Sequence, residues 1–95
     1  MAAMMMSSTS MISSLAEVQI NGETVNTNTS GNLSGTDDDR PVLKVDEGDN
    51  FHVKGDVTTD KSNSAAVEAD NATVVVNGNA TASDGAGVDA MNKSD

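Results

Sequence analysis

The strongest constraint on the fold is an internal repeat in which two short patterns alternate along the chain. The first pattern is apolar–x–apolar, then a polar residue and a glycine, and its three copies are Val18–Val25, Phe51–Thr58 and Val74–Thr81. The second is a short run of small or apolar residues with a charged residue in third place, found at Val42–Val45, Ala66–Ala69 and Gly87–Ala90. Gly55 and Gly78 are 23 residues apart, Leu43 and Val67 are 24 apart, and Val67 and Val88 are 21 apart. Regular spacing of this length between short β patterns indicates a solenoid in which each repeat is one coil.

Strand geometry then predicts which side chains enter the interior, because successive side chains of a strand point to opposite faces. Gln19, His52 and Val75 are expected to face outward. The inward set is Val18, Ile20, Phe51, Val53, Val74 and Val76. Stacked coils would bring these inward residues into line.

Composition agrees with a thin interior and excludes a large conventional core. Leu, Ile, Val and Phe total 17 of 95 residues, one residue is aromatic, and the net charge is −10. Such a composition is typical of disorder, but a solenoid needs few large apolar residues because each coil buries its face against its neighbours.

The same composition excludes several classes of function. The chain has no cysteine, so it forms no disulfide, and His52 is its only histidine, so it cannot build a Cys/His zinc site. Fifteen acidic residues against five basic ones would repel nucleic acid and anionic membranes. We predict neither nucleic-acid binding nor insertion into a membrane.

Residues 1–16 differ in composition from the rest of the chain. They hold five of the six methionines and no charged residue, and they end in Ser14-Leu15-Ala16 before Glu17. Small residues on both sides of Leu15 match a signal-peptidase site, so we expect a partial signal peptide cleaved after Ala16, with the true start upstream. The alternative is a disordered leader.

Residues 17–95 form the expected repeat region, interrupted once. Gly22 and Gly55 are 33 residues apart, about ten more than the repeat requires. The surplus falls in the Thr/Ser/Gly/Asp tract at about 28–40, which is therefore predicted to be a loop insertion.

Two alternatives compete with coils. Asn21-Gly22 and Asn77-Gly78, flanked by β-formers, are also strong signals for type I′ hairpins. Hairpins predict that Ile20 pairs with Glu23, whereas coils do not. The second alternative is a largely disordered chain, because two to three coils are few for a stable stack.

The run Val74–Ala82, followed by Asp84–Ala90, resembles the coil repeats of right-handed parallel β-helices in bacterial surface proteins and autotransporter-like passengers. The resemblance implies an all-β, right-handed β-solenoid of about two to three coils, secreted or at the cell surface. It also implies a non-enzymatic stalk or adhesin-like binding surface. Its partner would be a host or cell-surface glycan or protein. Because such proteins run to many coils, the chain is expected to be a fragment.

Two acidic segments are candidates for calcium binding. Asp37, Asp38 and Asp39 could offer oxygens to calcium but lack EF-hand spacing, so a solvated loop is predicted. Asp84–Met91 matches most of one calcium-binding β-roll nonapeptide, although such sites need successive turns; the alternative is a turn that leads into a strand at Val88–Ala90.

The resemblance also admits a β-helical polysaccharide-degrading enzyme as an alternative. The candidate carboxylates are Glu47, Asp49, Asp56 and Glu68, but they stand out only in an acidic chain, and no basic cluster or aromatic platform accompanies them. His52 is expected to be an exposed strand residue. We predict no catalytic residue, no cofactor and no metal site.

Asparagine recurs in two further patterns. Asn21 and Asn77 are predicted to occupy equivalent turns, where their amides could bond between coils, with Lys54 interrupting the ladder. Sequons begin at Asn28, Asn32, Asn71, Asn79 and Asn92, and they matter only in a eukaryotic secretory pathway.

Overall fold

The computed structural model describes residues 17–91 and 94–95. The predicted signal peptide, its cleavage site and the sequon at Asn92 lie outside these residues. The described part of the chain is all-β: eleven short strands and no helix. The strands are β2 (Glu17–Ile20), β3 (Glu23–Val25), β4 (Thr29–Ser30), β5 (Leu33–Ser34), β6 (Leu43–Asp46), β7 (Asn50–Val53), β8 (Val57–Thr59), β9 (Val67–Asp70), β10 (Thr73–Val76), β11 (Ala80–Ala82) and β12 (Val88–Met91).

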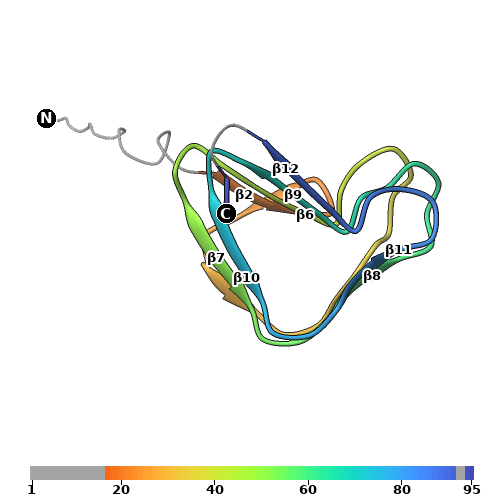
Figure 1. The fold of residues 1–95 in the computed structure, drawn as a ribbon, viewed down its shortest axis with the longest axis horizontal. Helices are drawn as coiled ribbons and strands as arrows, with labels where there is room; N and C mark the ends of the chain where they lie inside the picture. Colours follow the sequence, from red (N-terminus) through yellow and green to blue (C-terminus); the bar gives the residue numbers. More distant parts are fainter. Residues whose placement is uncertain (1–16, 92–93) are drawn as a thin grey trace, which may run out of the picture.

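Three sheets form the sides of a short, roughly triangular stack, seen end-on in Figure 1. One sheet has the order β10-β7-β4 and the second has the order β11-β8-β5; both are parallel throughout. The third has the order β12-β9-β6-β2-β3, and its β12, β9 and β6 are parallel. One strand of each parallel series makes up a layer, so the described residues form a short solenoid-like stack.

Strand register follows the sequence repeat. Val74 lies beside Phe51, and Val67 lies between Leu43 and Val88. Copies of the second pattern at 42–45, 66–69 and 87–90 therefore lie in register in three successive layers. Copies of the first pattern at 51–58 and 74–81 lie in register in two layers. This confirms the parallel stacking that their spacing predicts.

The interior is filled by the inward residues of these strands. Phe51 and Val53 are buried, with His52 exposed between them, and Val75 lies half exposed on the outer face of β10. The buried apolar core is Val18, Val42, Leu43, Val45, Phe51, Val53, Val57, Ala66, Val67, Ala69 and Ala72. Valine and alanine predominate because the space between the sheets is narrow.

The first predicted repeat copy, Val18–Val25, is not a coil. β2 and β3 are antiparallel, Ile20 lies opposite Glu23, and β2 is antiparallel to β6. Asn21 and Gly22 have φ values of 50° and 82°, the left-handed pair that a type I′ turn requires. The hairpin alternative is therefore correct here, and the coil prediction is wrong. At Asn77-Gly78 the reverse holds, because β10 and β11 continue into different parallel sheets.

The predicted loop insertion at about 28–40 also requires correction. This tract contains β4 and β5, which pair in parallel with β7 and β8. It is the first two sides of the first layer, and β6 is its third. The ten surplus residues reflect the hairpin that precedes this layer, and no loop is inserted into a coil.

Candidate functional site

A ladder of polar side chains lies in the turns that precede β5, β8 and β11. Oδ1 of Asn32 accepts a hydrogen bond from the N–H of Asp56 at 2.8 Å, and Oδ1 of Asp56 accepts one from the N–H of Asn79, also at 2.8 Å. Each side chain thus satisfies a backbone donor in the next layer. Asn32, Asp56 and Asn79 are consequently held in one line across three layers.

Glycine at the neighbouring position makes this ladder sterically feasible. A Cβ on Gly78 would lie 2.7 Å from the carbonyl oxygen of Gly55 and closer still to Oδ1 of Asp56. A Cβ on Gly55 would likewise collide with Oδ1 of Asn32. The repeated glycine of the sequence pattern therefore leaves room for the side chain of the previous layer.

A second line of polar side chains runs along the strands themselves. Ser34 lies beside Thr58, and Thr58 lies beside Thr81. All three side chains are exposed. Alternation along the strand turns Val57 inward and Thr58 outward, so the hydroxyls face solvent in a column.

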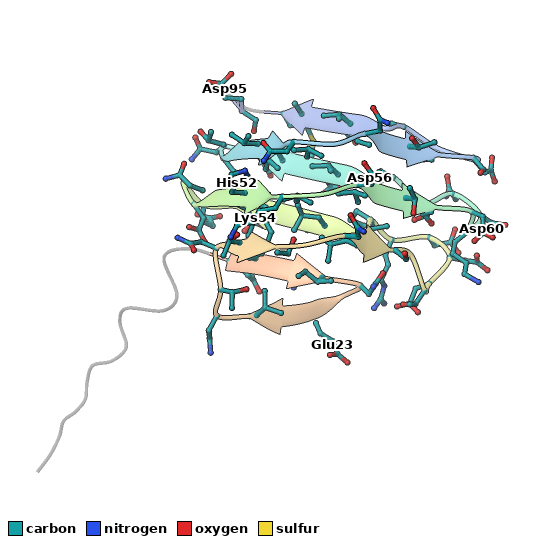
Figure 2. The ribbon with its side chains drawn as sticks, turned by 90° about the horizontal axis from the view of Figure 1, so that it is seen from below. Glu23, His52, Lys54, Asp56, Asp60 and Asp95 are labelled. Carbon is teal, nitrogen blue, oxygen red and sulfur yellow. The ribbon has the colours of Figure 1, made fainter. Side chains whose placement is uncertain are left out.

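A third line continues where the strands end. Backbone bonds from the N–H of Gly35 to the oxygen of Thr58 (2.8 Å) and from the N–H of Ser83 to the oxygen of Thr59 (3.0 Å) keep the layers in register. Thr36, Asp60 and Ser83 follow at this edge, and all three are exposed. Figure 2 shows Asp56 and Asp60 at the two ends of the middle row.

We call these nine exposed residues the polar array. Its members are Asn32, Ser34, Thr36, Asp56, Thr58, Asp60, Asn79, Thr81 and Ser83. Neighbouring strands lie about 4.8 Å apart, so the strand residues Ser34, Thr58 and Thr81 form a regular column. The amide, hydroxyl and carboxylate groups of the other six members lie just before and just after these strands and complete a grid. Part of it is hollowed into a shallow depression that includes Ser34, Thr58 and Thr81.

A buried hydrogen-bond chain supports the array from behind. The hydroxyl of Thr59 donates to Oγ of Ser64 at 3.2 Å, and the Ser64 hydroxyl donates to the carbonyl oxygen of Arg40 at 2.8 Å. Ser64 is fully buried and Thr59 nearly so. Two layers are thus fixed to each other behind the grid.

A polar groove runs beside the sheet that contains β6 and β9. It is lined by Gln19, Arg40, Lys44 and Glu68, and a neighbouring hollow extends it to Asp89. Nζ of Lys44 lies 3.8 Å from Oε2 of Glu68, in the next layer. The groove thus holds the cations of Arg40 and Lys44 together with the carboxylates of Asp39, Glu68 and Asp89.

Acidic groups lie side by side where β6 and β9 end and β2 begins. Asp46 is opposite Glu17 and beside Asp70. Burial raises the pKa of the Asp46 carboxyl, and the negative charge of Glu17 raises it further. Oδ1 of Asp46 is buried and has no hydrogen-bond partner among the described residues.

The three predicted loop carboxylates each have a different structural contact. Asp37 lies 3.4 Å from the Arg40 guanidinium. Oδ1 of Asp38 accepts a hydrogen bond from the Ser62 N–H at 2.8 Å, and Oδ1 of Asp39 accepts one from the Asn63 amide at 3.2 Å. The run therefore links one turn to the equivalent turn of the next layer.

The segment Asp84–Met91 forms a turn followed by β12, as the alternative interpretation predicts. Oδ2 of Asp84 accepts a hydrogen bond from the Asn63 N–H at 3.2 Å. Within residues 17–91 and 94–95, no three His, Cys, Asp or Glu side chains gather in a metal-binding arrangement.

The carboxylates considered for glycoside chemistry lie on different parts of the stack. Glu47 and Asp49 belong to the turn between β6 and β7, Asp56 precedes β8, and Glu68 is on β9. His52 is exposed on β7, as expected. Asp56 has a role in the ladder that sequence reasoning missed.

The asparagine ladder exists, but with other residues than predicted. Asn21 lies in the hairpin, where its amide donates to the oxygen of Ser34 (3.0 Å) and its Oδ1 accepts from the N–H of Thr36 (3.1 Å). The observed ladder is Asn32, Asp56 and Asn79, and the exchange of amide for carboxylate in the middle hides it from a search for identical residues. Of the sequon asparagines, Asn28, Asn32, Asn71 and Asn79 are exposed.

Comparison with protein-family models, curated proteins and solved structures finds no match to this chain. None of the described residues belongs to a helix long and apolar enough to cross a membrane.

Proposed function

We propose that this chain is a non-enzymatic, exported cell-surface β-solenoid segment that serves as a structural stalk with an adhesin-like binding surface. The observation that carries the proposal is the polar array, nine exposed side chains in register across three layers, in which Asn32 and Asp56 are hydrogen-bonded to the next layer. Such an array can meet an extended partner at many points without closing around it. The right-handed parallel β-helices of bacterial surface proteins, which the repeats resemble, suggest the exported location.

A hydroxyl-rich glycan is the partner class that fits the array. Thr58 and Thr81 can both donate and accept hydrogen bonds, while Asp56 and Asp60 accept from sugar hydroxyls. Any single contact of this kind contributes only about 1 kcal/mol, so useful adhesion requires many contacts along a repeating polymer. A regular grid supplies them.

Binding can be tested by coating beads with the full chain and measuring retention on insoluble polysaccharides. Thr58→Val with Thr81→Val removes two hydroxyls from the array while keeping the β-branched shape. It should reduce retention about thirtyfold, because two bonds of about 1 kcal/mol each amount to about 2 kcal/mol. Thr73→Val is the matched control, because Thr73 is exposed on the β4-β7-β10 sheet. Retention that is equal for parent, double variant and control would reject the array as the adhesive surface.

Export needs its own experiment. Because the leader is expected to lack its beginning, the first 30 residues can be fused behind a short basic start segment to a reporter enzyme that is active only outside the cytoplasm. We expect reporter activity and cleavage after Ala16, and we expect the cleavage to be lost when Ser14 and Ala16 are both replaced by bulky residues. An inactive reporter, or equal cleavage of both leaders, would contradict export through this leader.

A further inference from the structure

Two of the five basic residues of the chain meet in one pocket of the polar groove. The pocket has a volume of about 350 Å³, which is in the range of small-molecule sites. It is lined by Gln19, Gly22, Asp39, Arg40, Pro41, Lys44 and Glu68. Five of these seven residues carry polar side chains, so a ligand for the pocket must be hydrophilic. Two cations side by side, in a chain with fifteen acidic residues, indicate that the ligand carries an anionic group.

The pocket occurs once in the stack and is not repeated from layer to layer. The positions equivalent to Lys44 in the next two layers are Glu68 and Asp89. The position equivalent to Arg40 in the next layer is Ser64, which is fully buried. At these positions only the first layer carries cations, so the pocket is a single site.

The β2–β3 hairpin places groups on the other side of the pocket. A Cβ on Gly22 would collide with the guanidinium of Arg40, so this guanidinium lies directly against the backbone of the hairpin turn. Gln19 on β2 lies opposite Lys44 on β6. The hairpin thus adds an amide beside the ammonium group and supports the second cation.

Neither cation is saturated by its ion pair. Nη1 of Arg40 lies 3.4 Å from Oδ2 of Asp37, and Nζ of Lys44 lies 3.8 Å from Oε2 of Glu68. Charge-assisted hydrogen bonds are shorter, at about 2.8 Å, and a guanidinium or an ammonium has several N–H donors. The carboxylates therefore keep the two cations at the pocket and leave donors available for a ligand.

Two carboxylates in the same pocket can act as hydrogen-bond acceptors. Oδ1 of Asp39 accepts a hydrogen bond from the Asn63 amide at 3.2 Å, and Glu68 is paired with Lys44. Each carboxylate thus already has a partner for its charge, and its remaining lone pairs suit neutral hydroxyl donors. The pocket therefore offers donors for an anion next to acceptors for hydroxyls.

We propose that this pocket binds a sugar acid, a monosaccharide unit that carries one carboxylate and several hydroxyls. Arg40, Lys44 and the Gln19 amide donate to the carboxylate, while Asp39 and Glu68 accept from neighbouring hydroxyls. The net charge of −10 disfavours a long polyanion, so the ligand is a single acidic unit. The proposal does not depend on the polar array, because the pocket and the array share no residue.

Glucuronate is the probe, and glucose is its matched control because it has a hydroxymethyl group in place of the carboxylate. Each sugar is titrated into the isotopically labelled full chain and followed by NMR. Glucuronate should shift the side-chain signals of Gln19 and Arg40 first. Glucose should bind at least tenfold more weakly, as expected when hydrogen bonds to charged groups are lost. Both titrations use the parent chain, so this comparison does not require a variant to fold.

Three variants test the role of the cations. Lys44→Gln should weaken glucuronate binding about tenfold, whereas Lys44→Arg, which keeps the charge, should retain most of it. Lys54→Gln makes the same change of charge at an exposed residue that follows β7 (Figure 2) and should leave binding unchanged. Circular dichroism of each variant shows whether the β structure is retained.

Several results would overturn the proposal. Equal affinity for glucuronate and glucose would remove the role of the cations, and equal weakening by Lys44→Gln and Lys54→Gln would leave only an effect of net charge. Acetate bound as tightly as glucuronate would reduce the pocket to an anion site, and tighter binding of glycine would assign it to amino acids. The double variant Thr58→Val, Thr81→Val should leave glucuronate binding unchanged, so failure of the polar array and failure of this pocket are distinguishable.

Discussion

Small polar side chains at the turns bind one layer of the stack to the next. Asn32 and Asp56 each accept the backbone N–H of the residue that follows a turn in the layer above, and Asp38 does the same for Ser62. Short side chains suit this role because they reach one strand spacing and lose little entropy on ordering. In this acidic chain, several carboxylates thus serve as structural acceptors.

Replacement of Gly78 by alanine should destabilise the stack by about 1–3 kcal/mol, because the added methyl group would collide with Oδ1 of Asp56 and with the carbonyl oxygen of Gly55. The control is Gly31→Ala, since a Cβ on Gly31 has no atom within 4 Å. Urea unfolding of both variants measures the difference. A cost for Gly31→Ala as large as that for Gly78→Ala would show that the ladder is not the cause.

Replacement of Asp46 by asparagine should stabilise the chain at neutral pH. The pKa of Asp46 is raised by burial and by the charge of Glu17, so the folded state binds a proton more readily than the unfolded state. Stability conferred by protonation is therefore gained as the pH falls through the raised folded pKa and is lost as the pH rises again. The benefit of Asp46→Asn should be present at pH 7 and small at pH 3.

The measurement is the urea midpoint at both pH values, with Asp60→Asn as the control for the loss of one exposed negative charge. An equal gain in the two variants at pH 7 would attribute the effect to net charge alone. A gain for Asp46→Asn that persists at pH 3 would contradict the role assigned to its burial.

At the scale of elements, the β2–β3 hairpin depends on a turn that few residues tolerate. Asn21 has a φ of 50°, its side chain bonds both Ser34 and Thr36, and its N–H donates to Val42 at 2.8 Å. Asn21 thus joins the hairpin to β5 and to the residue that precedes β6, in addition to the pairing of β2 with β6.

Asn21→Ala should consequently cost about 2 kcal/mol, from backbone strain and two lost hydrogen bonds. Asn77→Ala is a matched comparison: Asn77 also precedes glycine, but it is not among the described residues with positive φ, so its replacement should cost much less. Thermal unfolding of the two variants gives the comparison. Equal melting temperatures would mean that the hairpin does not limit stability.

Sequence reasoning predicts the strands that repeat with similar residues and misses those that do not. Val42–Val45 and Ala66–Ala69 share a pattern because both fill the same interior. Thr29–Ser30 and Leu33–Ser34 fall in the tract that the sequence predicts to be a loop, because two-residue strands leave no detectable periodicity and pair only through β7 and β8.

The polar array is only partly predictable from the sequence for the same reason. Two rows of the polar array, at positions 56–60 and 79–83, overlap the ends of the repeat copies at 51–58 and 74–81, so a polar face could be predicted there. Asn32, Ser34 and Thr36 complete the grid from within the supposed insertion, and only the register of the stack reveals them. The Val18–Val25 copy fits a coil and a hairpin equally well in sequence, because Asn21-Gly22 flanked by β-formers allows both.

At the scale of the whole molecule, a net charge of −10 opposes compaction. Added salt screens this repulsion, with a Debye length of about 10 Å at 0.1 M and about 3 Å at 1 M. We expect the urea midpoint to rise when sodium chloride increases from 0.01 to 0.5 M, and to rise similarly with other monovalent salts at equal ionic strength. A midpoint that falls or does not change would contradict a net destabilising effect of the charge.

The β2–β3 hairpin also sets an order of assembly. β2 and β3 join across a two-residue turn, whereas each parallel pair in the stack must close a loop of 21 or more residues. Local contacts form fastest, since a hairpin closes in about 1–10 μs and long loops cost more entropy. The hairpin is therefore the natural nucleus, on which β6 can pair first and later layers can add in turn. A chain that emerges amino-terminus first, from a ribosome or across a membrane, would present its own template before the strands that need it.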